Sequence, residues 1–397
     1  MAIVKMIDIC EKIGSGATPR GGKEAYCDEG ISLVRSQNVL DFAFSRDGLA
    51  HINDEQAQKL NNVEVHEGDV LLNITGDSVA RACMMDSVFL PARVNQHVAI
   101  VRGKENKVIN SFILYFLQWR KGYLLQLASA GATRNALTKG MIEQLEINLP
   151  SMNEQKKIVA ILDSIQQKIQ LNQKINDNLY TQARAITNRW IAENKDDYDL
   201  LSLSEVAAIN PDTYSPKEEW EYVNYLDTSS ITDGCIADIQ RIIPASEKLP
   251  SRARRIIAPN DVVFSTVRPN QRHFGIISEP LPNMLASTGF AVIRSENPLV
   301  CNELIYLCLT ENAFIEKMQQ LAEQSTSTFP SIKPSDLGVC EIPCPKDGLS
   351  SNLTETLRAM FALVAANHRE NASLAELRDS LLPKLMSGEI YVSDIQL

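Results

Sequence analysis

The chain has 397 residues, of which 44% are hydrophobic and 22% are charged, and its formal net charge is −10. The length predicts two or three domains, each large enough to bury its own core, and the composition is that of an ordinary globular protein. The longest apolar runs fall short of the ~20 residues that a membrane span requires. The N-terminus MAIVKMIDIC also lacks the apolar region of a signal peptide, so we expect a cytoplasmic protein with no membrane partner.

The eight cysteines are scattered along the chain, without a C-x-x-C motif or Cys/His pairs at zinc spacing. We interpret them as reduced thiols, several of them in a core. The five histidines are isolated from one another and indicate neither a metal site nor a catalytic triad. The sequence therefore predicts no metal and no cofactor.

An internal repeat organises the chain. The first half contains LVRSQNV (33–39), VHEGDVLLNITG (65–76), VAIVR (98–102) and NSFILYFL (110–117). The second half contains YLDTSSI (225–231), IAPNDVVFSTVR (257–268), FAVIR (290–294) and NELIYLCL (302–309). All four pairs are displaced by 192 positions, and this constant displacement indicates a duplicated unit although the identity is low.

Each copy of this unit reads as a mixed domain. Short β-branched runs alternate with turn residues and predict strands, and one helix per copy is expected at 111–129 and at 302–323. A half-buried sheet with a helix predicts an α+β fold.

A long helix is expected after each domain, because a narrow apolar stripe repeats at alternating steps of four and three residues. In the first copy the stripe comprises Ile158, Leu162, Ile165, Ile169, Asn172, Asn176, Leu179, Ala183, Ile186 and Trp190. In the second copy, displaced by 195, it comprises Leu353, Leu357, Met360, Val364, Asn367, Asn371, Leu374, Arg378, Leu381 and Leu385. Both stripes are the seam of a coiled coil, with two asparagines at the centre.

The two helices are natural partners for each other. Four seam positions flank the asparagines on each side, which favours an antiparallel pair about a pseudo-twofold axis, with Asn172, Asn176, Asn367 and Asn371 setting the register. The alternative is two independent core helices. Ser151 with Glu154 predicts a capping box for the first helix, and Asn352 with Glu355 marks the start of the second. Pro383 is expected to kink or end the second helix, and Gly388 to cap it.

Catalytic motifs are incomplete. GATPRGGK (16–23) lacks the G-K-[S/T] ending of a phosphate loop and is better interpreted as a turn-rich loop. INPDTY (209–214) is close to the N-P-P-Y signature of adenine methyltransferases, but it has Asp212 at the second proline and no glycine-rich cofactor loop upstream. The lysine of a nuclease motif is also absent after Pro211 and Asp212.

Basic residues cluster at 240–275, where the local charge is +5 in an acidic chain. Such a cluster suits phosphate contacts, and nearby Arg, Gln and Asn side chains can read base edges. The candidates here are Arg252, Arg254, Arg255, Arg268, Gln271 and Arg272. The thinner candidates of the first half are Arg81, Arg134, Asn135 and Lys139. The alternative for each residue is a solvated loop.

NLPSMNEQKKIVAILDSIQQKIQLNQKIN and ELRDSLLPKLMSGEI resemble the central and C-terminal conserved regions of the DNA-specificity subunit of Type I restriction-modification systems. The resemblance covers the whole chain. It implies two target-recognition domains, 1–150 and 197–345, separated by two conserved helical regions, 151–196 and 346–397. The second copy departs from the first, because L-T-E-T-L-R stands where the central E-Q-K-K-I-V motif is expected.

The resemblance also implies a function. A subunit of this family is not itself an enzyme; it binds double-stranded DNA at a bipartite sequence with a fixed spacer. Two modification (methyltransferase) subunits bind alongside it, and two restriction (translocase and endonuclease) subunits can join them. The alternatives from other classes are a self-contained DNA methyltransferase or nuclease, and a coiled-coil scaffold with no DNA role.

Overall fold

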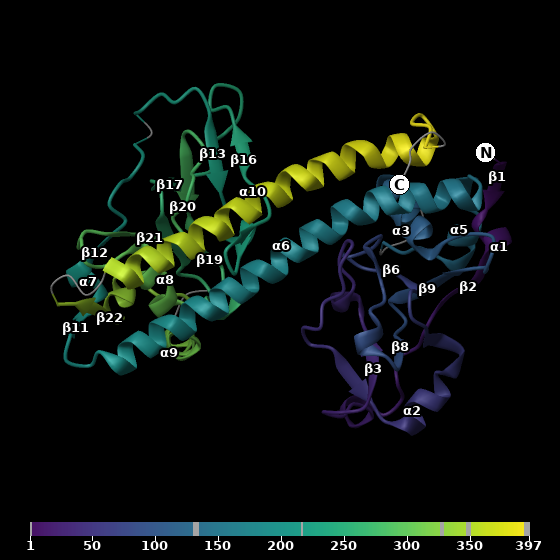
Figure 1. The fold of residues 1–397 in the computed structure, drawn as a ribbon, viewed down its shortest axis with the longest axis horizontal. Helices are drawn as coiled ribbons and strands as arrows, with labels where there is room; N and C mark the ends of the chain where they lie inside the picture. Colours follow the sequence, from purple (N-terminus) through teal and green to yellow (C-terminus); the bar gives the residue numbers. More distant parts are fainter. Residues whose placement is uncertain (1, 130–134, 216, 326–328, 347–350, 393–397) are drawn as a thin grey trace. The chain divides into compact units, whose positions relative to one another are not determined.

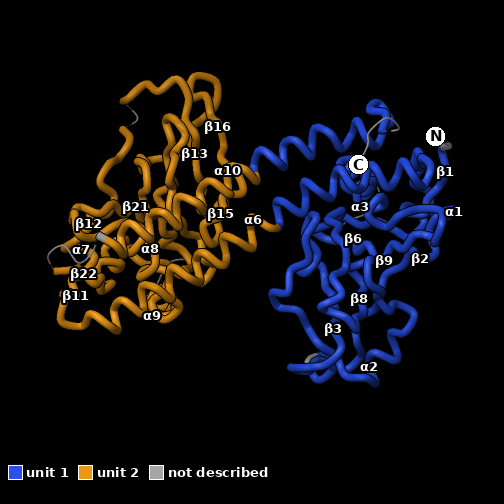
Figure 2. Tube along the Cα trace, viewed as in Figure 1, with its two compact units in different colours: residues 1–170, 372–397 blue, residues 171–371 orange. Residues whose placement is uncertain are grey.

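The computed structural model describes residues 2–129, 135–215, 217–325, 329–346 and 351–392 (Figure 1). The chain divides into two compact units, shown in blue and orange in Figure 2. Unit 1 comprises residues 1–170 and 372–397, and unit 2 comprises residues 171–371. Each unit therefore contains part of each long helix.

Unit 1 is built on two four-stranded sheets. The first has the order β2 (Cys10–Ser15), β9 (Val98–Gly103), β6 (Val70–Asn73) and β7 (Ala82–Met84). The second has the order β4 (Ala50–Ile52), β3 (Ile31–Val34), β8 (Ala92–Val94) and β5 (Glu64–Val65). The pair β3 and β8 is parallel, and the other neighbours are antiparallel. A further pair joins β1 (Ala2–Lys5) to β10 (Glu146–Leu149). The helices are α1 (Met6–Ile9), α2 (Asp54–Lys59), α3 (Asn110–Trp119), α4 (Lys121–Ser129) and α5 (Lys139–Glu143).

Unit 2 repeats this topology. One sheet has the order β12 (Ala207–Ile209), β21 (Phe290–Ser295), β18 (Asp261–Ser265) and β19 (Phe274–Ile277). The other has the order β16 (Gln240–Ile242), β13 (Val223–Leu226), β20 (Met284–Ser287) and β17 (Ala253–Ile256), with β13 and β20 parallel. Two antiparallel pairs complete the strands: β11 (Tyr198–Ser202) with β22 (Glu341–Pro345), and β14 (Ile231–Thr232) with β15 (Cys235–Ile236). The helices are α7 (Leu203–Val206), α8 (Asn302–Leu309) and α9 (Asn312–Glu323).

The central strands are apolar throughout because both of their faces are covered. In β6, Val70 and Leu72 pack into a core that contains Phe112 of α3, whereas Leu71 packs into a second core with Leu33. Successive side chains of a strand point to opposite faces, so one strand supplies both cores. Strand β18 does the same in unit 2, where Phe264 and Val263 lie in different cores. The predicted α+β class is confirmed.

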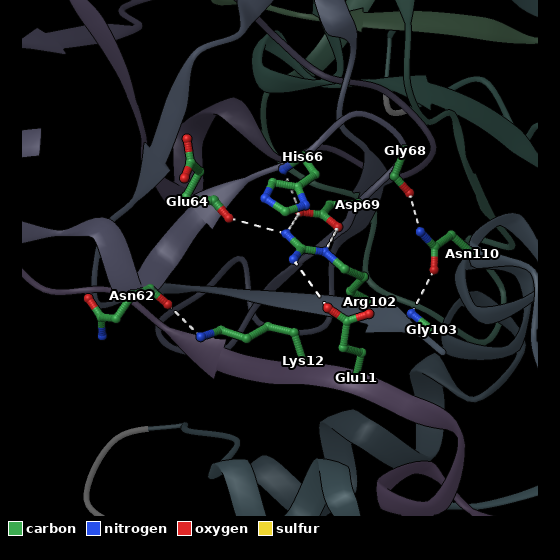
Figure 3. Close-up of polar contacts among 10 residues, drawn as sticks. All are labelled: Glu11, Lys12, Asn62, Glu64, His66, Gly68, Asp69, Arg102, Gly103 and Asn110. Carbon is green, nitrogen blue, oxygen red and sulfur yellow. Dashed lines mark hydrogen bonds and ion pairs between the residues drawn. The ribbon is translucent and has the colours of Figure 1, made fainter. Parts of the chain in front are cut away.

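The displacement of 192 is visible in individual contacts. Arg102 donates from Nε and Nη2 to the two carboxylate oxygens of Asp69 at 2.7 Å each (Figure 3), and Arg294 makes the same two contacts with Asp261 at 2.8 Å each. Asn110 joins Gly68 to Gly103 (Figure 3), and the equivalent Asn302 joins Asn260 to Ser295. The duplication predicted from the sequence is therefore confirmed.

The prediction of a single helix in each copy is wrong, because each predicted helix is divided into two. α3 is followed by α4 after Arg120, and α8 is followed by α9 after Thr310 and Glu311. In unit 2 the guanidinium of Arg184 donates to the carbonyl oxygens of Leu307 and Thr310 at 3.2 Å each. These carbonyls belong to the end of a helix, where they lack intrahelical partners, so Arg184 stabilises the break.

The two long helices are α6 (Met152–Glu193) and α10 (Ser351–Ser387), and no described helix is both long and apolar enough to cross a membrane. The predicted capping box is present: the N–H of Ser151 donates to Glu154 Oε2 at 2.9 Å, and the N–H of Glu154 donates to Ser151 Oγ at 3.4 Å. Helix α10 already includes Asn352 and continues past Pro383 to Ser387, so Pro383 does not end it. Gly388 follows with a φ of 81°, the left-handed conformation of a C-terminal cap.

Within each unit the segments of α6 and α10 run antiparallel, as predicted. In unit 2 Asn172 Nδ2 donates to Asn371 Oδ1 at 2.9 Å, and Asn367 Nδ2 donates to Asn176 Oδ1 at 2.7 Å. As the residue number rises along α6 from 172 to 176, the number of its partner on α10 falls from 371 to 367, which is the pattern of antiparallel helices. In unit 1 the contact is between Gln166 and Arg378, where Nη1 of the arginine donates to Oε1 at 2.9 Å.

Candidate nucleic-acid interface

Polar segments follow the parallel strands of each unit. In unit 1, residues 35–39 follow β3 and residues 95–97 follow β8. Because neighbouring parallel strands end at the same edge of a sheet, these two segments start side by side. Ligands of open sheets commonly bind beyond the carboxyl ends of parallel strands.

Two further segments join this edge. The N–H of Ile74, just after β6, donates to the carbonyl of His97 at 2.9 Å, and the N–H of Leu137 donates to the carbonyl of Ile74 at 2.8 Å. The amide of Asn73 donates to the carbonyl of Ser36 at 2.8 Å. We call residues 35–39, 74–81, 95–97 and 135–138 the first loop set.

The first loop set includes neutral polar side chains besides the exposed Arg81. Gln96 is exposed; it accepts a hydrogen bond from Thr18 Oγ1 at 2.6 Å and contacts the Nε2 atom of His97 at 2.9 Å. The other ring nitrogen of His97 lies 2.5 Å from Thr75 Oγ1. These contacts fix the side-chain amide of Gln96, which keeps spare donor and acceptor capacity. An amide held in this way can form the bidentate pair that reads adenine.

Unit 2 has the equivalent arrangement. The N–H of Thr266 donates to the carbonyl of Gly289 at 2.8 Å, and the N–H of Ile332 donates to the carbonyl of Thr266 at 2.9 Å. A Cβ added to Gly289 would lie 2.7 Å from Thr228 Cγ2, so the segment after β13 also reaches this edge. We call residues 227–233, 266–273, 287–289 and 329–332 the second loop set.

The side chains of the second loop set differ from those of the first. Tyr225 Oη donates to Asp227 Oδ1 at 3.0 Å, and burial is the main cause that raises the pKa of this tyrosine. The guanidinium carbon of Arg268 lies 4.8 Å from the ring centroid of Phe329, which is 54% exposed. An arginine over an exposed ring offers both charge and a flat stacking surface.

Comparisons with known proteins address the family. The family model described as "Type I restriction modification DNA specificity domain" matches residues 1–181. The chain is 21% identical to the Type I restriction enzyme HindI specificity subunit of Haemophilus influenzae, over 91% of this chain and 94% of that protein. It is 20% identical to the putative MjaX specificity subunit of Methanocaldococcus jannaschii, over 97% of this chain and 92% of that protein. The predicted resemblance to Type I specificity subunits is confirmed.

A solved structure supports the fold of this relative of the specificity subunits. The S subunit of a Type I restriction-modification system from M. genitalium aligns with a TM-score of 0.54 at 15% identity. The alignment covers 97% of this chain and 96% of that chain. The comparisons favour a specificity subunit over a self-contained methyltransferase or nuclease, and over a scaffold without a DNA role.

The candidates of the first half fall near the first loop set. Arg81 is exposed in the turn before β7, and Asn135 is exposed with its carbonyl accepting from the N–H of Gly76 at 3.2 Å. Lys139 is the exposed first residue of α5 and forms an ion pair with Glu143 at 3.4 Å. Arg134 lies outside the described residues.

The arginines in and directly before β17 are not equivalent to one another. Arg252 is exposed, and its carbonyl accepts from the N–H of Thr288 in the second loop set at 2.8 Å. Arg254 and Arg255 are half-buried, and the strand register shifts between Ala253 and Arg255. Burial lowers the pKa of Arg255, whose Nη1 lies 3.4 Å from Thr213 Oγ1. Of the three, Arg252 is the most exposed and contacts the second loop set.

The residues of the loop at 268–272 also differ in role. Arg268 and the exposed Gln271 belong to the second loop set. Arg272 donates from Nε to Asp233 Oδ1 at 2.6 Å and from Nη1 to Asn312 Oδ1 at 3.2 Å. Its charge is therefore neutralised locally, and it joins the loop to α9.

Some polar residues of the loop sets were missed in the sequence. Gln96 and His97 follow the strand β8, and Asp227 follows β13. The sequence did contain a signal for Asp227, since LVRSQNV and YLDTSSI are one of the repeated pairs and both pass from apolar to polar residues. None of the three lies in the basic cluster at 240–275.

The methyltransferase-like stretch INPDTY has a structural explanation. Asp212 accepts from Arg294 Nη1 at 2.7 Å, and Arg294 also holds the buried Asp261. The N–H of Tyr214 donates to the carbonyl of Arg254 at 2.7 Å. Both residues thus stabilise unit 2. Among the described residues, no group of three or more His, Cys, Asp or Glu side chains could hold a metal.

Proposed function

We propose that this chain is the DNA-reading subunit of a Type I restriction-modification complex, in which each loop set recognises one half of a bipartite target. Within the first loop set we assign DNA contacts to Arg81, Asn135 and Gln96, and directly after it to Lys139. Within and beside the second we assign them to Arg252, Arg268 and Gln271. Arg134 remains a prediction of the same kind.

One observation carries the proposal. The same strand ends meet in both units, through equivalent backbone hydrogen bonds, but the side chains that they carry differ. At positions displaced by 192, Arg35 corresponds to Asp227, Gln96 to Thr288 and His97 to Gly289. A conserved framework with different polar groups is what recognition of two different half-sites requires, because base identity is read by side chains. We therefore expect an asymmetric target.

The chain acts, in this proposal, without catalysis of its own. Two modification subunits supply the methylation of adenine, and restriction subunits join them as further partners. Helices α6 and α10 fix the spacer between the half-sites: a helix of about 40 residues is roughly 60 Å long at about 1.5 Å per residue. The asparagines Asn172, Asn176, Asn367 and Asn371 fix the register of this pair, since buried polar seam residues penalise shifted alignments.

The test is a map of methylated adenines produced by the reconstituted complex with its modification subunits. Gln96→Ala should relax the preference in one half-site by about tenfold, the value of one good base contact, and leave the other half-site unchanged. Arg252→Ala with Arg268→Ala should act on the other half-site, and should also reduce the dependence of DNA affinity on salt concentration.

A matched control is Arg189→Ala. Arg189 is exposed on α6, outside both loop sets, and forms an ion pair with Glu193 at 2.8 Å. Its replacement removes one positive charge, as each of the two arginine substitutions does, and should leave both half-sites unchanged. If the loop variants and the control behave alike, the assignment of the loop sets is wrong. Methylation by the purified chain alone would instead overturn the non-catalytic role.

A further inference from the structure

Phe42 has an unusual backbone conformation. Its φ is 61°, a left-handed value that is strained for a bulky side chain. The equivalent position in unit 2, displaced by 192, is Gly234 with a φ of 79°. The backbone partners are also equivalent: the N–H of Phe42 donates to Ala82 at 2.9 Å and that of Gly234 to Phe274 at 2.8 Å. The turn favours glycine, so the phenylalanine needs a separate explanation.

The ring of Phe42 lies against the long helices of unit 1. The guanidinium carbon of Arg378, on α10, is 4.2 Å from the ring centroid, and the ring of Tyr115 on α3 is 6.1 Å away. The carbonyl of Phe42 accepts a hydrogen bond from Gln170 Nε2 of α6 at 3.3 Å. Arg378 in turn donates to Gln166 of α6. Phe42 thus contacts both helices at once.

The equivalent place in unit 2 uses different residues. A Cβ on Gly234 would lie 3.0 Å from the hydroxyl oxygen of Tyr180 on α6, so a side chain there would have to displace that hydroxyl. The Tyr180 ring packs on Tyr306 and Phe361 at 6.1 and 5.4 Å. Position 375 of α10, equivalent to Tyr180, is an alanine. The aromatic ring comes from the loop in unit 1 and from the helix in unit 2.

Phe42 belongs to the same segment as part of the first loop set. Asn38 Nδ2 donates to the carbonyls of Ser45 and Asp47 at 3.0 and 3.2 Å. Gln37 Nε2 donates to the carbonyl of Gly48 at 3.1 Å. Hydrogen bonds therefore hold residues 35–48 together as one segment, and Phe42 attaches that segment to α6 and α10.

We propose that Phe42 and Arg378 are positioning residues for the half-site that the first loop set recognises. They hold the segment 35–48 against the long helices, so recognition depends on a contact that lies outside the loops. This inference rests on the proposed function of the first loop set. The strain at Phe42 is retained because the ring over Arg378 is needed for position, where glycine would give a more relaxed turn.

The test compares Phe42→Gly with Phe42→Tyr in the reconstituted complex, by the methylation map described above. Phe42→Gly adopts the turn without strain but lacks the ring, and should relax the preference at the first half-site by about tenfold, as for a misplaced base contact. The second half-site should be unchanged. Phe42→Tyr keeps a ring over Arg378 and should restore the preference.

Two further variants complete the design. Arg378→Met removes the charge over the ring but keeps much of the volume, and should resemble Phe42→Gly; it also replaces that variant if glycine prevents folding. Phe89→Leu is the matched control, because its ring packs on Phe44 of the segment 35–48 at 4.8 Å and against the core that contains Leu33, whereas Phe42 packs against the core that contains residues of α6 and α10. It should leave both half-sites unchanged.

The outcomes separate the two proposals. If Gln96→Ala relaxes the first half-site whereas Phe42→Gly and Arg378→Met do not, the positioning role is overturned and the loop set stands. A change in thermal stability alone, with both half-sites intact, also overturns it. If none of the three variants changes either half-site, both proposals are overturned.

Discussion

The side-chain amide of Asn367 donates to Oδ1 of Asn176 at 2.7 Å, and both side chains are buried between the helices of unit 2. Among the described residues, the Nδ2 atom of Asn176 has no hydrogen-bond partner. Replacing both residues by leucine should therefore raise the free energy of unfolding by about 1–2 kcal/mol, because an unsatisfied amide is exchanged for buried apolar surface. Urea unfolding measures this, and the methylation map should show a less strict spacer as the register loosens.

The single variant Asn367→Leu is the control. It removes the hydrogen bond that the Asn176 carbonyl oxygen accepts and should cost about 1–3 kcal/mol. If the single and double variants stabilise the protein equally, the pair does not act as a unit. An unchanged spacer preference in the double variant would count against a role of the asparagines in register.

The paired Asp–Arg contacts of the two repeats should differ in strength. Asp69→Ala leaves Arg102 with the carbonyl oxygen of Glu64 at 3.2 Å and the carboxylate of Glu11 at 3.9 Å, and should cost about 3 kcal/mol. Asp261→Ala leaves Arg294 with Asp212 at 2.7 Å, so its cost should be smaller. Thermal unfolding of both variants tests the order. A larger loss for Asp261→Ala would show that Asp212 does not compensate.

The sequence predicted the parts of the fold that repetition makes visible. The displacement of 192 placed Asp69 with Asp261 and Arg102 with Arg294 before any contact was known. The seam predicted the antiparallel helices because their period is local. The breaks after α3 and α8 were missed because the partner that stabilises the second break, Arg184, lies more than 120 residues away.

The candidate site was predicted less well for the same reason. The sequence does not distinguish Arg252, Arg254, Arg255 and Arg272 from one another. Their different roles depend on burial and on partners that are distant in the chain. Arg272 is neutralised by Asp233, which is 39 residues earlier in the chain. The left-handed backbone at Phe42 could not be predicted either, because that conformation favours glycine and the sequence has an aromatic residue there.

Thiol labelling should distinguish two cysteines from the other six. Cys27 and Cys235 are exposed, whereas burial raises the pKa of Cys10, Cys83, Cys301 and Cys340 to about 12. A thiolate is the reactive form, so at pH 8 the native protein should show two rapidly reacting thiols, and all eight after denaturation. Desolvation raises the pKa of Cys235, so Cys27 should react first. Cys27→Ser should remove the fastest phase; its persistence would contradict the assignment.

Asp163 should make stability depend on pH. Burial raises the pKa of its carboxyl from 3.8, and the hydrogen bond from Tyr115 Oη at 2.6 Å opposes this to a lesser extent. The folded state therefore binds the proton more tightly than the unfolded state. The stabilisation of the folded state by this proton is fully present below pH 3.8, the ordinary pKa of the carboxyl. It is lost as the pH rises through the raised pKa of the folded state.

Replacing Asp163 by asparagine tests this sign. Asparagine keeps an acceptor for Tyr115 but has no charge to desolvate, so the unfolding temperature of the variant should increase relative to wild type as pH rises from 4 toward neutrality. Tyr115→Phe removes the hydrogen bond that lowers the pKa of the Asp163 carboxyl, so this pKa should rise further. The pH range over which the stability of the folded protein changes should then extend upward. A pH-independent difference between wild type and Asp163→Asn would mean that the carboxyl is not desolvated in the folded protein.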